Sequence, residues 1–213
     1  MFRPDPVESI PQIAVRYFLF TLAVFAAIFV IFLLVPRHGV GLFSDGSPLE
    51  WGQFVMMVCA AMVFLWAAAA APGLRRLSCV LACFPGLAAA RELDSFFDAL
   101  IPFFGWQLPF YIILAIGLVV AFGKREEFFQ QLPVLCAHRS FALMWSGLMI
   151  VIPFAQLVGH GPFLKELFGD DYVRPMKRMI EEVAETIGYV VIVCAAVDWK
   201  IYSGKVGLPR GND

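Results

Sequence analysis

Long apolar segments constrain this chain more than any other feature. About six of them follow one another along the 213 residues, joined by short connections. A helix needs roughly 20 apolar residues to cross a bilayer, so six such helices use nearly the whole chain. The sequence therefore predicts an all-α, polytopic membrane protein with about six transmembrane helices in a single membrane domain, without a soluble domain. The predicted spans cover residues 13–35, 51–71, 77–100, 108–122, 140–158 and 175–202.

The composition excludes several alternatives. Hydrophobic residues make up 61% of the chain and charged residues 15%, whereas soluble domains average about 45–50% apolar and about 25% charged. The formal net charge of −1 supplies no long-range attraction for nucleic acid. We therefore expect the lipid bilayer as the main partner of this chain and no nucleic-acid partner.

Local patterns refine the helix boundaries. Ser47 and Glu50 form a capping box at the start of the second span. The alanines at 67–71 would let a neighbouring helix approach closely, which also favours an oligomer or a partner in a membrane complex. The sequence Pro85-Gly86 predicts a break in the third span, and the segment 128–138 is predicted to lie at the membrane interface because Pro133 interrupts it.

Basic residues predict the orientation. With alternating topology, the N-terminus, the second and fourth connections and the C-terminus together hold ten lysines and arginines, and the opposite connections hold five. Positive charge accumulates on the cytoplasmic side of membrane proteins. The pattern predicts that both termini lie in the cytoplasm, and the short, weakly charged chain is typical of a bacterial inner membrane.

Polar residues gather at one end of three predicted spans. The second span begins, the third ends and the sixth begins on the same side, which is the periplasmic side in this orientation. Charged groups in or near hydrocarbon are unfavourable, so several at one depth indicate a cavity, an ion site or an acid/base centre. The residues concerned are Glu50, Gln53, Arg91, Glu92, Asp94, Asp98, Glu181, Glu182, Glu185 and Tyr189.

Spacing selects the best candidates among these residues. Arg91, Asp94 and Asp98 would share one stripe of a continuous helix, as would Glu182, Glu185 and Tyr189. Carboxylates spaced in this way can share a proton or a cation. If the protein is an enzyme, the predicted catalytic residues are Glu92, Asp94 and Glu185, and the remaining members of the group would bind substrate or an ion.

Structural roles compete with these assignments. Glu50 is explained by the capping box, and Arg91 by the tendency of intramembrane charges to pair. Glu181 and Glu182 lie in the first turns of the last helix, where negative charge favours the helix dipole.

The histidines and cysteines give weak metal and cofactor signals. His38, His138 and His160 all fall in predicted loops, which disfavours a haem held between two spans. His160 could join Glu92 and Glu185 as ligands of a divalent metal, although no H-x-x-x-H or C-x-x-C pattern supports such a site. Ser140 has no evident histidine partner in the sequence, so nucleophilic catalysis lacks support.

Three functional hypotheses follow. The first is a transport or channel protein, or a subunit of a membrane complex that acts in the envelope or in defence. The second is a membrane-embedded, metal-dependent enzyme that acts on a lipid or isoprenoid-linked substrate, with Arg91 holding a phosphate. The third is a sensor of pH or divalent cations.

Overall fold

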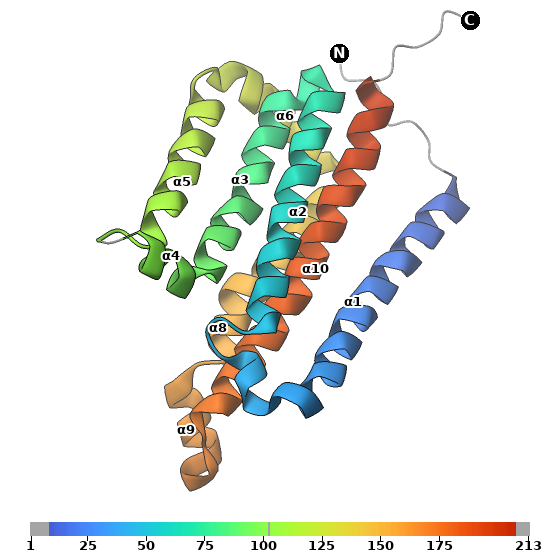
Figure 1. Cartoon of the computed structure of the whole chain (residues 1–213). Coiled ribbons are helices and arrows are strands. Elements are labelled where there is room, and N and C mark those ends of the chain that lie inside the picture. The colour runs from blue at the N-terminus through green and yellow to red at the C-terminus, as the bar shows by residue number, and fades with distance from the viewer. Residues whose placement is uncertain (1–8, 102, 208–213) are drawn as a thin grey trace, which may run out of the picture.

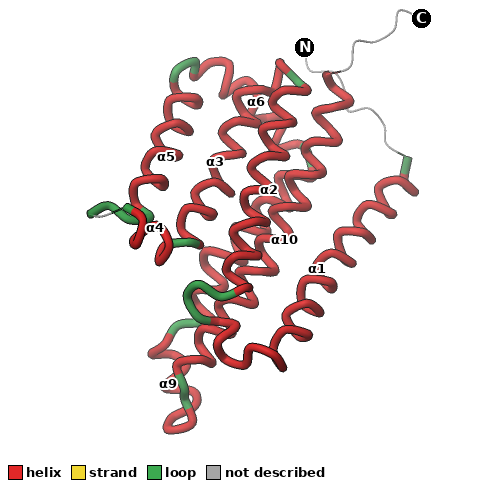
Figure 2. Tube along the Cα trace, in the orientation of Figure 1, coloured by secondary structure: helices red, strands yellow, loops and turns green. Residues whose placement is uncertain are grey.

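The computed structural model describes residues 9–101 and 103–207, and every regular element within them is helical (Figures 1 and 2). The all-α class predicted from the sequence is therefore confirmed. The longer helices are α1 (Ile10–His38), α2 (Pro48–Ala70), α3 (Arg75–Glu92), α5 (Gln107–Phe122), α6 (Arg125–Ala137), α7 (Arg139–Met149) and α10 (Arg174–Gly207). The shorter elements are η1 (Gly39–Phe43), η2 (Pro72–Leu74), α4 (Asp94–Leu100), the π-helical η3 (Ile150–Phe154), α8 (Ala155–Val158), α9 (Gly161–Phe168) and η4 (Gly169–Asp171).

Helix α10 is the centre of the bundle. It packs against α2, α7 and α1, while α2 packs on α3 and α3 packs on α5. Phe64, Leu77 and Trp199 are almost fully buried where these helices meet, and the Trp199 indole donates a hydrogen bond to Ser78 Oγ at 2.8 Å. Figure 1 shows α1 standing apart from α10 over the middle of its length.

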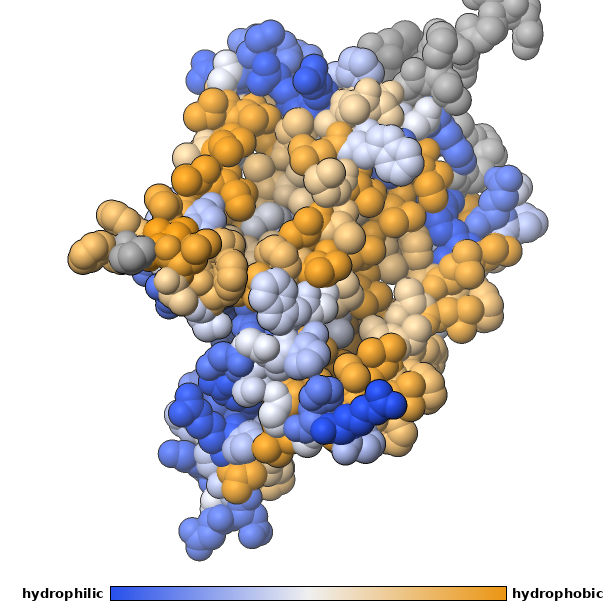
Figure 3. Space-filling model, viewed as in Figure 1, coloured by the Kyte–Doolittle hydropathy of each residue, from blue (hydrophilic) through white to orange (hydrophobic). Residues whose placement is uncertain are grey.

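The outer surface of the bundle is apolar. Phe18, Phe25 and Phe32 of α1 are exposed by more than half, as are many large side chains on other helices. In Figure 3 hydrophobic residues predominate across the middle of the molecule, and hydrophilic residues gather at its two ends. A wide apolar belt between polar ends is compatible with an integral membrane protein.

Four segments are long and apolar enough to cross a membrane, and a fifth is added if α5 and α6, which are bent by 96°, count as one. The predicted total of six spans is therefore not confirmed. Helix α5 has only 16 residues, and α10 carries charged residues along its length. The four segments are Ile10–Phe43, Pro48–Ala70, Pro72–Glu92 and Arg139–Val158.

The third predicted span differs from the prediction in where it breaks. Helix α3 continues through Pro85-Gly86 and ends at Glu92, and Leu93 separates it from α4 with φ −106° and ψ 44°. The Pro85 ring is fully buried, and the packing of α3 between α2 and α5 holds the helix together there. The break expected at Pro85-Gly86 is therefore absent, because this packing outweighs the local effect of the proline. The prediction of one helix over 77–100 was also wrong, because the backbone leaves the helical conformation at Leu93.

The predicted features of α2 are present. Ser47 Oγ accepts a hydrogen bond from the Glu50 amide at 3.3 Å, while the Glu50 carboxylate accepts one from the Gly46 amide. Ala67, Ala68 and Ala71 are buried inside the chain itself. The alanine stripe therefore serves packing within the bundle, and its burial removes the argument that it contacts another subunit.

Two glycines set the close approach of α7 and α10. A Cβ added at Gly188 would lie 2.5 Å from Val151 Cγ2 and 3.0 Å from the Gly147 carbonyl oxygen. A contact of 2.5 Å cannot form unless the Val151 side chain or the neighbouring helix shifts, and the Gly147 carbonyl leaves little room for such a shift. By contrast, a Cβ added at Gly52 of α2 would meet nothing within 4 Å.

Replacing Gly188 with alanine should therefore destabilise the protein by about 1–3 kcal/mol, because the two helices would have to separate. The matched variant Gly52→Ala should raise stability by about 0.5–1 kcal/mol, because alanine loses less backbone entropy in a helix. Unfolding in detergent, followed by tryptophan fluorescence, would measure both. Equal effects of the two variants would show that the helices are not in close contact at Gly188.

Candidate functional site

A buried hydrogen bond joins α3 to α10 near one end of the bundle. The Tyr189 hydroxyl donates to Glu92 Oε1 at 2.5 Å, and the two residues are only 1% and 7% exposed. Within the described residues Glu92 forms no ion pair. A carboxyl group that has lost water without gaining a cationic partner carries its charge unfavourably.

The neighbouring residue of α3 contacts α10 one turn away. Arg91 Nη2 lies 4.0 Å from Glu185 Oε1, and Gln156 of α8 donates to the same oxygen at 3.3 Å. The Glu185 side chain is 7% exposed, whereas that of Arg91 is 51% exposed. Arg91 therefore lies at the boundary between the buried carboxylates and the surroundings of the protein.

Helix α2 adds a buried amide to this region. Gln53 is fully buried, and its amide nitrogen donates to Thr186 Oγ1 at 2.9 Å and to the Glu182 carbonyl oxygen at 3.1 Å. The Gln53 amide oxygen is buried and accepts no hydrogen bond in the described part of the chain. Buried acceptors are almost always satisfied in native proteins, so this oxygen needs a donor or a cation.

We call Gln53, Glu92, Glu185, Thr186 and Tyr189 the carboxylate site. Its side chains come from α2, α3 and α10, and hydrogen bonds join α10 to α2 through Thr186 and Gln53 and to α3 through Tyr189 and Glu92. All of its polar side chains can supply oxygen ligands: two carboxylates, an amide oxygen and two hydroxyls. Such a set accepts protons or hard cations and contains no soft ligand such as thiolate or imidazole.

Several predicted members stand outside this site. Asp94 accepts a hydrogen bond from the Ser95 amide, and Asp98 accepts one from the Trp106 amide at 3.1 Å. The expected stripe of Arg91, Asp94 and Asp98 does not form, because the helix ends before Asp94. Both aspartates instead hold the turns of α4 and the chain that follows it.

The other acidic candidates have structural partners. Glu50 caps α2, and Glu181 forms an ion pair with Lys177 Nζ at 2.9 Å. The Glu181 side chain also fills the space beside Gly159, where an added Cβ would meet it at 2.0 Å. Glu182 contributes its carbonyl oxygen to Gln53 and Thr186, with its side chain partly exposed.

The metal ligands considered from the sequence are not brought together. In residues 9–101 and 103–207, no group of three or more His, Cys, Asp or Glu side chains is placed to hold a metal ion. His160 is exposed at the start of α9, away from the hydrogen bonds that Glu92 and Glu185 make. The arrangement gives no geometric support for a metal centre of His160, Glu92 and Glu185.

A second polar cluster, which the sequence reasoning missed, lies nearer the other end of α10. Asp198 is fully buried, and Arg16 of α1 donates to its Oδ1 at 2.8 Å. Ser140 Oγ donates to Oδ2 at 2.8 Å, and His138 Nδ1 and Arg139 Nε each lie 3.8 Å from that oxygen. We call these five residues the aspartate cluster. The isolated aspartate in the apolar stretch VVIVCAAVDW was the available signal.

Within this cluster Ser140 has a histidine neighbour, which corrects the expectation from the sequence. His138 Nδ1 lies 2.9 Å from Ser140 Oγ and accepts a hydrogen bond from the Ser140 amide at 3.2 Å, which caps α7. In a nucleophilic triad the histidine stands between serine and carboxylate. Here the serine stands between histidine and Asp198, so the cluster does not have the geometry of an activated nucleophile.

Comparison with protein-family models, with curated proteins and with solved structures finds no match for this chain. Its function must therefore be inferred from the two polar groups on α10 and from the apolar helices around them.

The aspartate cluster should be essential for stability. Replacing Asp198 with leucine removes the buried counter-charge of Arg16, which should lower the free energy of unfolding by about 3–5 kcal/mol. The double variant Arg16→Leu/Asp198→Leu should recover part of this loss, because no buried cation then lacks the carboxylate. Thermal unfolding in detergent measures both, and a double variant less stable than Asp198→Leu would contradict a direct interaction.

Proposed function

We propose that this chain is an integral membrane protein that moves protons or a small monovalent cation, with the carboxylate site as the binding position. The observation that carries the proposal is Glu92, a buried carboxyl that hydrogen-bonds Tyr189 and has no ion-pair partner among the described residues. Ionisable groups held in this way within membranes are characteristic of proton and ion pathways.

The distribution of polar groups along α10 supports the same proposal. The buried residues of α10 between Tyr189 and Asp198 are all apolar: Val190, Ile192, Cys194, Ala195 and Ala196. About 14 Å of helix separates the two polar residues. An apolar layer thus separates the carboxylate site from the aspartate cluster. Such an arrangement is expected of a closed ion pathway, in which the helices must move before a proton or cation can pass.

The sidedness of the proposal comes from the basic residues. We place the end of the molecule that contains the aspartate cluster in the cytoplasm of a bacterium and the carboxylate site toward the periplasm. Basic side chains accumulate on cytoplasmic connections. Those at the cytoplasmic end in this assignment are Arg75, Arg76, Lys124, Arg125, Arg139, Lys200 and Lys205.

Transport is tested directly by reconstitution. Vesicles that contain the purified protein and a trapped pH-sensitive dye should acidify faster than protein-free vesicles when a potassium diffusion potential is applied. Glu92→Gln should reduce the protein-dependent rate at least tenfold, because the amide removes the titratable carboxyl but keeps its shape. Glu126→Gln, an equivalent change at an exposed residue of α6, should leave the rate unchanged.

A parallel assay with radioactive sodium distinguishes a proton from a monovalent metal cation. Flux equal to that of protein-free vesicles in both assays would contradict the proposed function. Elution in size-exclusion chromatography and the unfolding temperature of Glu92→Gln must match the wild type. Loss of the folded protein in this variant would instead assign Glu92 to helix packing.

The orientation makes a separate prediction. In a cysteine-free background, Glu166→Cys in α9 should react with a membrane-impermeant maleimide in intact bacterial cells, whereas Glu126→Cys in α6 should react only after permeabilisation. Both positions are exposed, so access to the reagent decides labelling. The opposite pattern would invert the orientation, and identical labelling would place both residues on one side.

One observation favours the enzyme hypothesis as a second candidate. A groove of about 610 Å³ is lined by residues of α10, η3 and α8. One lining residue, Ala184, directly precedes Glu185 in the chain, and another, Phe154, directly precedes Ala155 of α8. An isoprenoid or acyl chain would fit such an apolar groove. This candidate predicts that the wild type, but not Glu185→Gln, alters a lipid of the reconstituted vesicles, as measured by mass spectrometry.

That the chain forms a homo-oligomer or binds a partner in a membrane complex stays a prediction.

A further inference from the structure

Helix α5 is too short to cross the hydrocarbon core of a bilayer by itself. Its 16 residues make about 24 Å of helix, whereas the core is about 30 Å thick. Helix α6 does not lengthen this path, because it bends away from α5 by 96°. If one end of α5 lies at the membrane boundary, its other end therefore lies about 6 Å inside the hydrocarbon.

Polar contacts show which end of α5 lies at the boundary. Arg76 of α3 donates to the Val120 carbonyl oxygen at 3.1 Å and to Glu127 Oε2 of α6 at 2.6 Å. Lys124 Nζ lies 3.2 Å from Glu127 Oε1. Charged groups of this kind remain in contact with water or headgroups. The opposite end of α5, at Gln107, is therefore the one inside the hydrocarbon.

Helix α3 ends at the same depth as the start of α5. A Cβ added at Gly86 of α3 would lie 3.4 Å from Ile113 Cγ2 of α5, so the two positions are side by side. Six residues further along each antiparallel helix, α3 ends at Glu92 and α5 begins at Gln107. The connection between them therefore starts and finishes about 6 Å below the membrane boundary.

Helix α4, which lies in this connection, is amphipathic. Asp94, Ser95 and Asp98 fall within about 100° of one another around the helix, and Phe96 and Leu100 fall on the opposite side. None of the residues 94–100 is buried. Amphipathic segments at a membrane surface bury their apolar side about 5–10 Å below the boundary. This depth agrees with the one that the length of α5 sets.

Two phenylalanines after α4 extend its apolar side. Phe103 is fully exposed and Phe104 is 62% exposed, while Phe96 and Leu100 of α4 are exposed by 45% and 62%. We call these four residues the α4 patch. In Figures 1 and 3 the connection between α4 and α5 projects sideways from the bundle, and its hydrophobic surface continues the apolar belt. The hydrophilic end of the molecule, which carries α9, lies beyond it.

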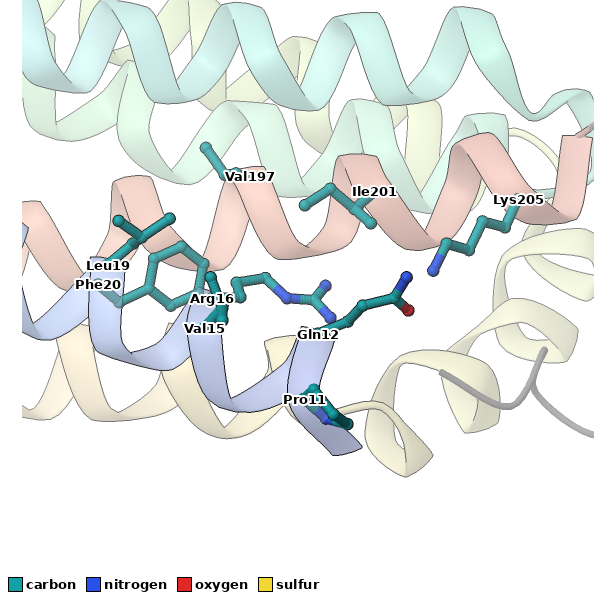
Figure 4. Close-up of a pocket in the computed structure, with 9 residues that line it drawn as sticks. All are labelled: Pro11, Gln12, Val15, Arg16, Leu19, Phe20, Val197, Ile201 and Lys205. Carbon is teal, nitrogen blue, oxygen red and sulfur yellow. The ribbon is translucent and has the colours of Figure 1, made fainter. Parts of the chain in front are cut away.

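The α4 patch differs in this respect from the groove between α1 and α10. That groove has a volume of about 560 Å³, and its polar lining residues are Gln12, Arg16 and Lys205 (Figure 4). Because Arg16 is paired with Asp198, its charge does not select a ligand for the groove. For the α4 patch, depth and amphipathic pattern together select lipid.

We propose that α4 and its connection to α5 insert into the leaflet on the side of the carboxylate site. The α4 patch lies among the acyl chains of that leaflet, and Asp94 and Asp98 face the headgroups. In the orientation given above this is the periplasmic leaflet. The inserted segment occupies the part of the hydrocarbon that α5 does not span.

The accessibility of a spin label measures the depth of the α4 patch. The full chain, with Phe103→Cys in a cysteine-free background, carries a nitroxide label and is reconstituted into phosphatidylcholine vesicles. Oxygen, which concentrates in hydrocarbon, should relax the label roughly threefold more than a neutral, water-soluble nickel chelate does. Ile112→Cys, on the exposed side of α5, should show the same preference, and Glu166→Cys, exposed in α9, the reverse.

The backbone at Phe103 permits a second test without a label. Its φ of +78° favours glycine and is tolerated by aspartate. Neither Phe103→Gly nor Phe103→Asp should therefore disturb the fold. In lipid nanodiscs Phe103→Asp should unfold at a lower temperature than Phe103→Gly, because a carboxylate is unfavourable among acyl chains.

Three results would overturn the proposal. A label at position 103 that the chelate relaxes more than oxygen does would lie in water. Exclusion of both reagents, with dipolar broadening between labels, would place the patch against a second copy of the chain. Equal unfolding temperatures of Phe103→Gly and Phe103→Asp in nanodiscs would show that this side chain does not contact hydrocarbon. If labelled Phe103→Cys does not fold, Phe104→Cys replaces it, with the same preference for oxygen expected.

Discussion

The burial of polar side chains along α10 is the constraint on which this structure depends. In a bilayer, apolar surfaces gain little by leaving lipid for protein, so helix association relies on close packing and on hydrogen bonds between helices. The contacts of Tyr189 with Glu92, of Thr186 with Gln53 and of Asp198 with Arg16 join α10 to α3, α2 and α1. Each contact fixes the register of one helix against α10, which apolar packing alone would not determine.

The two ends of α10 use such contacts differently. At the aspartate cluster the Asp198 carboxylate meets Arg16, Ser140 and nearby cationic groups, so its charge is compensated and the cluster is suited to holding helices together. At the carboxylate site, within the described residues, Glu92 hydrogen-bonds the Tyr189 hydroxyl and forms no ion pair, and the Gln53 amide oxygen has no donor. Uncompensated oxygens at the second position are the physical reason for proposing that a proton or cation binds there.

The sequence predicted the helices well where their ends carry strong local signals. The start of α2 at Pro48 follows the capping serine. The sequence failed at Pro133, because α6 (Arg125–Ala137) continues through the proline that was expected to interrupt this segment. It also failed at Pro85, where burial between neighbouring helices overrides the proline, and at Leu93, where no glycine or proline marks the end of α3. For the site, alternation of the helices brought Glu92, Glu185, Gln53 and Tyr189 correctly to one end. Asp94 and Asp98 were assigned to it only because α3 was expected to continue.

What the sequence by itself determined is the all-helical class, the apolar segments and the end of the bundle at which acidic residues gather. These follow from composition and from the direction in which each helix runs. Only the tertiary structure decided which polar groups touch, because contacts between residues 16 and 198, or 92 and 189, depend on helix rotation and crossing. The packing of Gly147 against Gly188 and the burial of the α2 alanines set that rotation. The rotation decides which carboxylates face another helix and which cap a neighbouring turn.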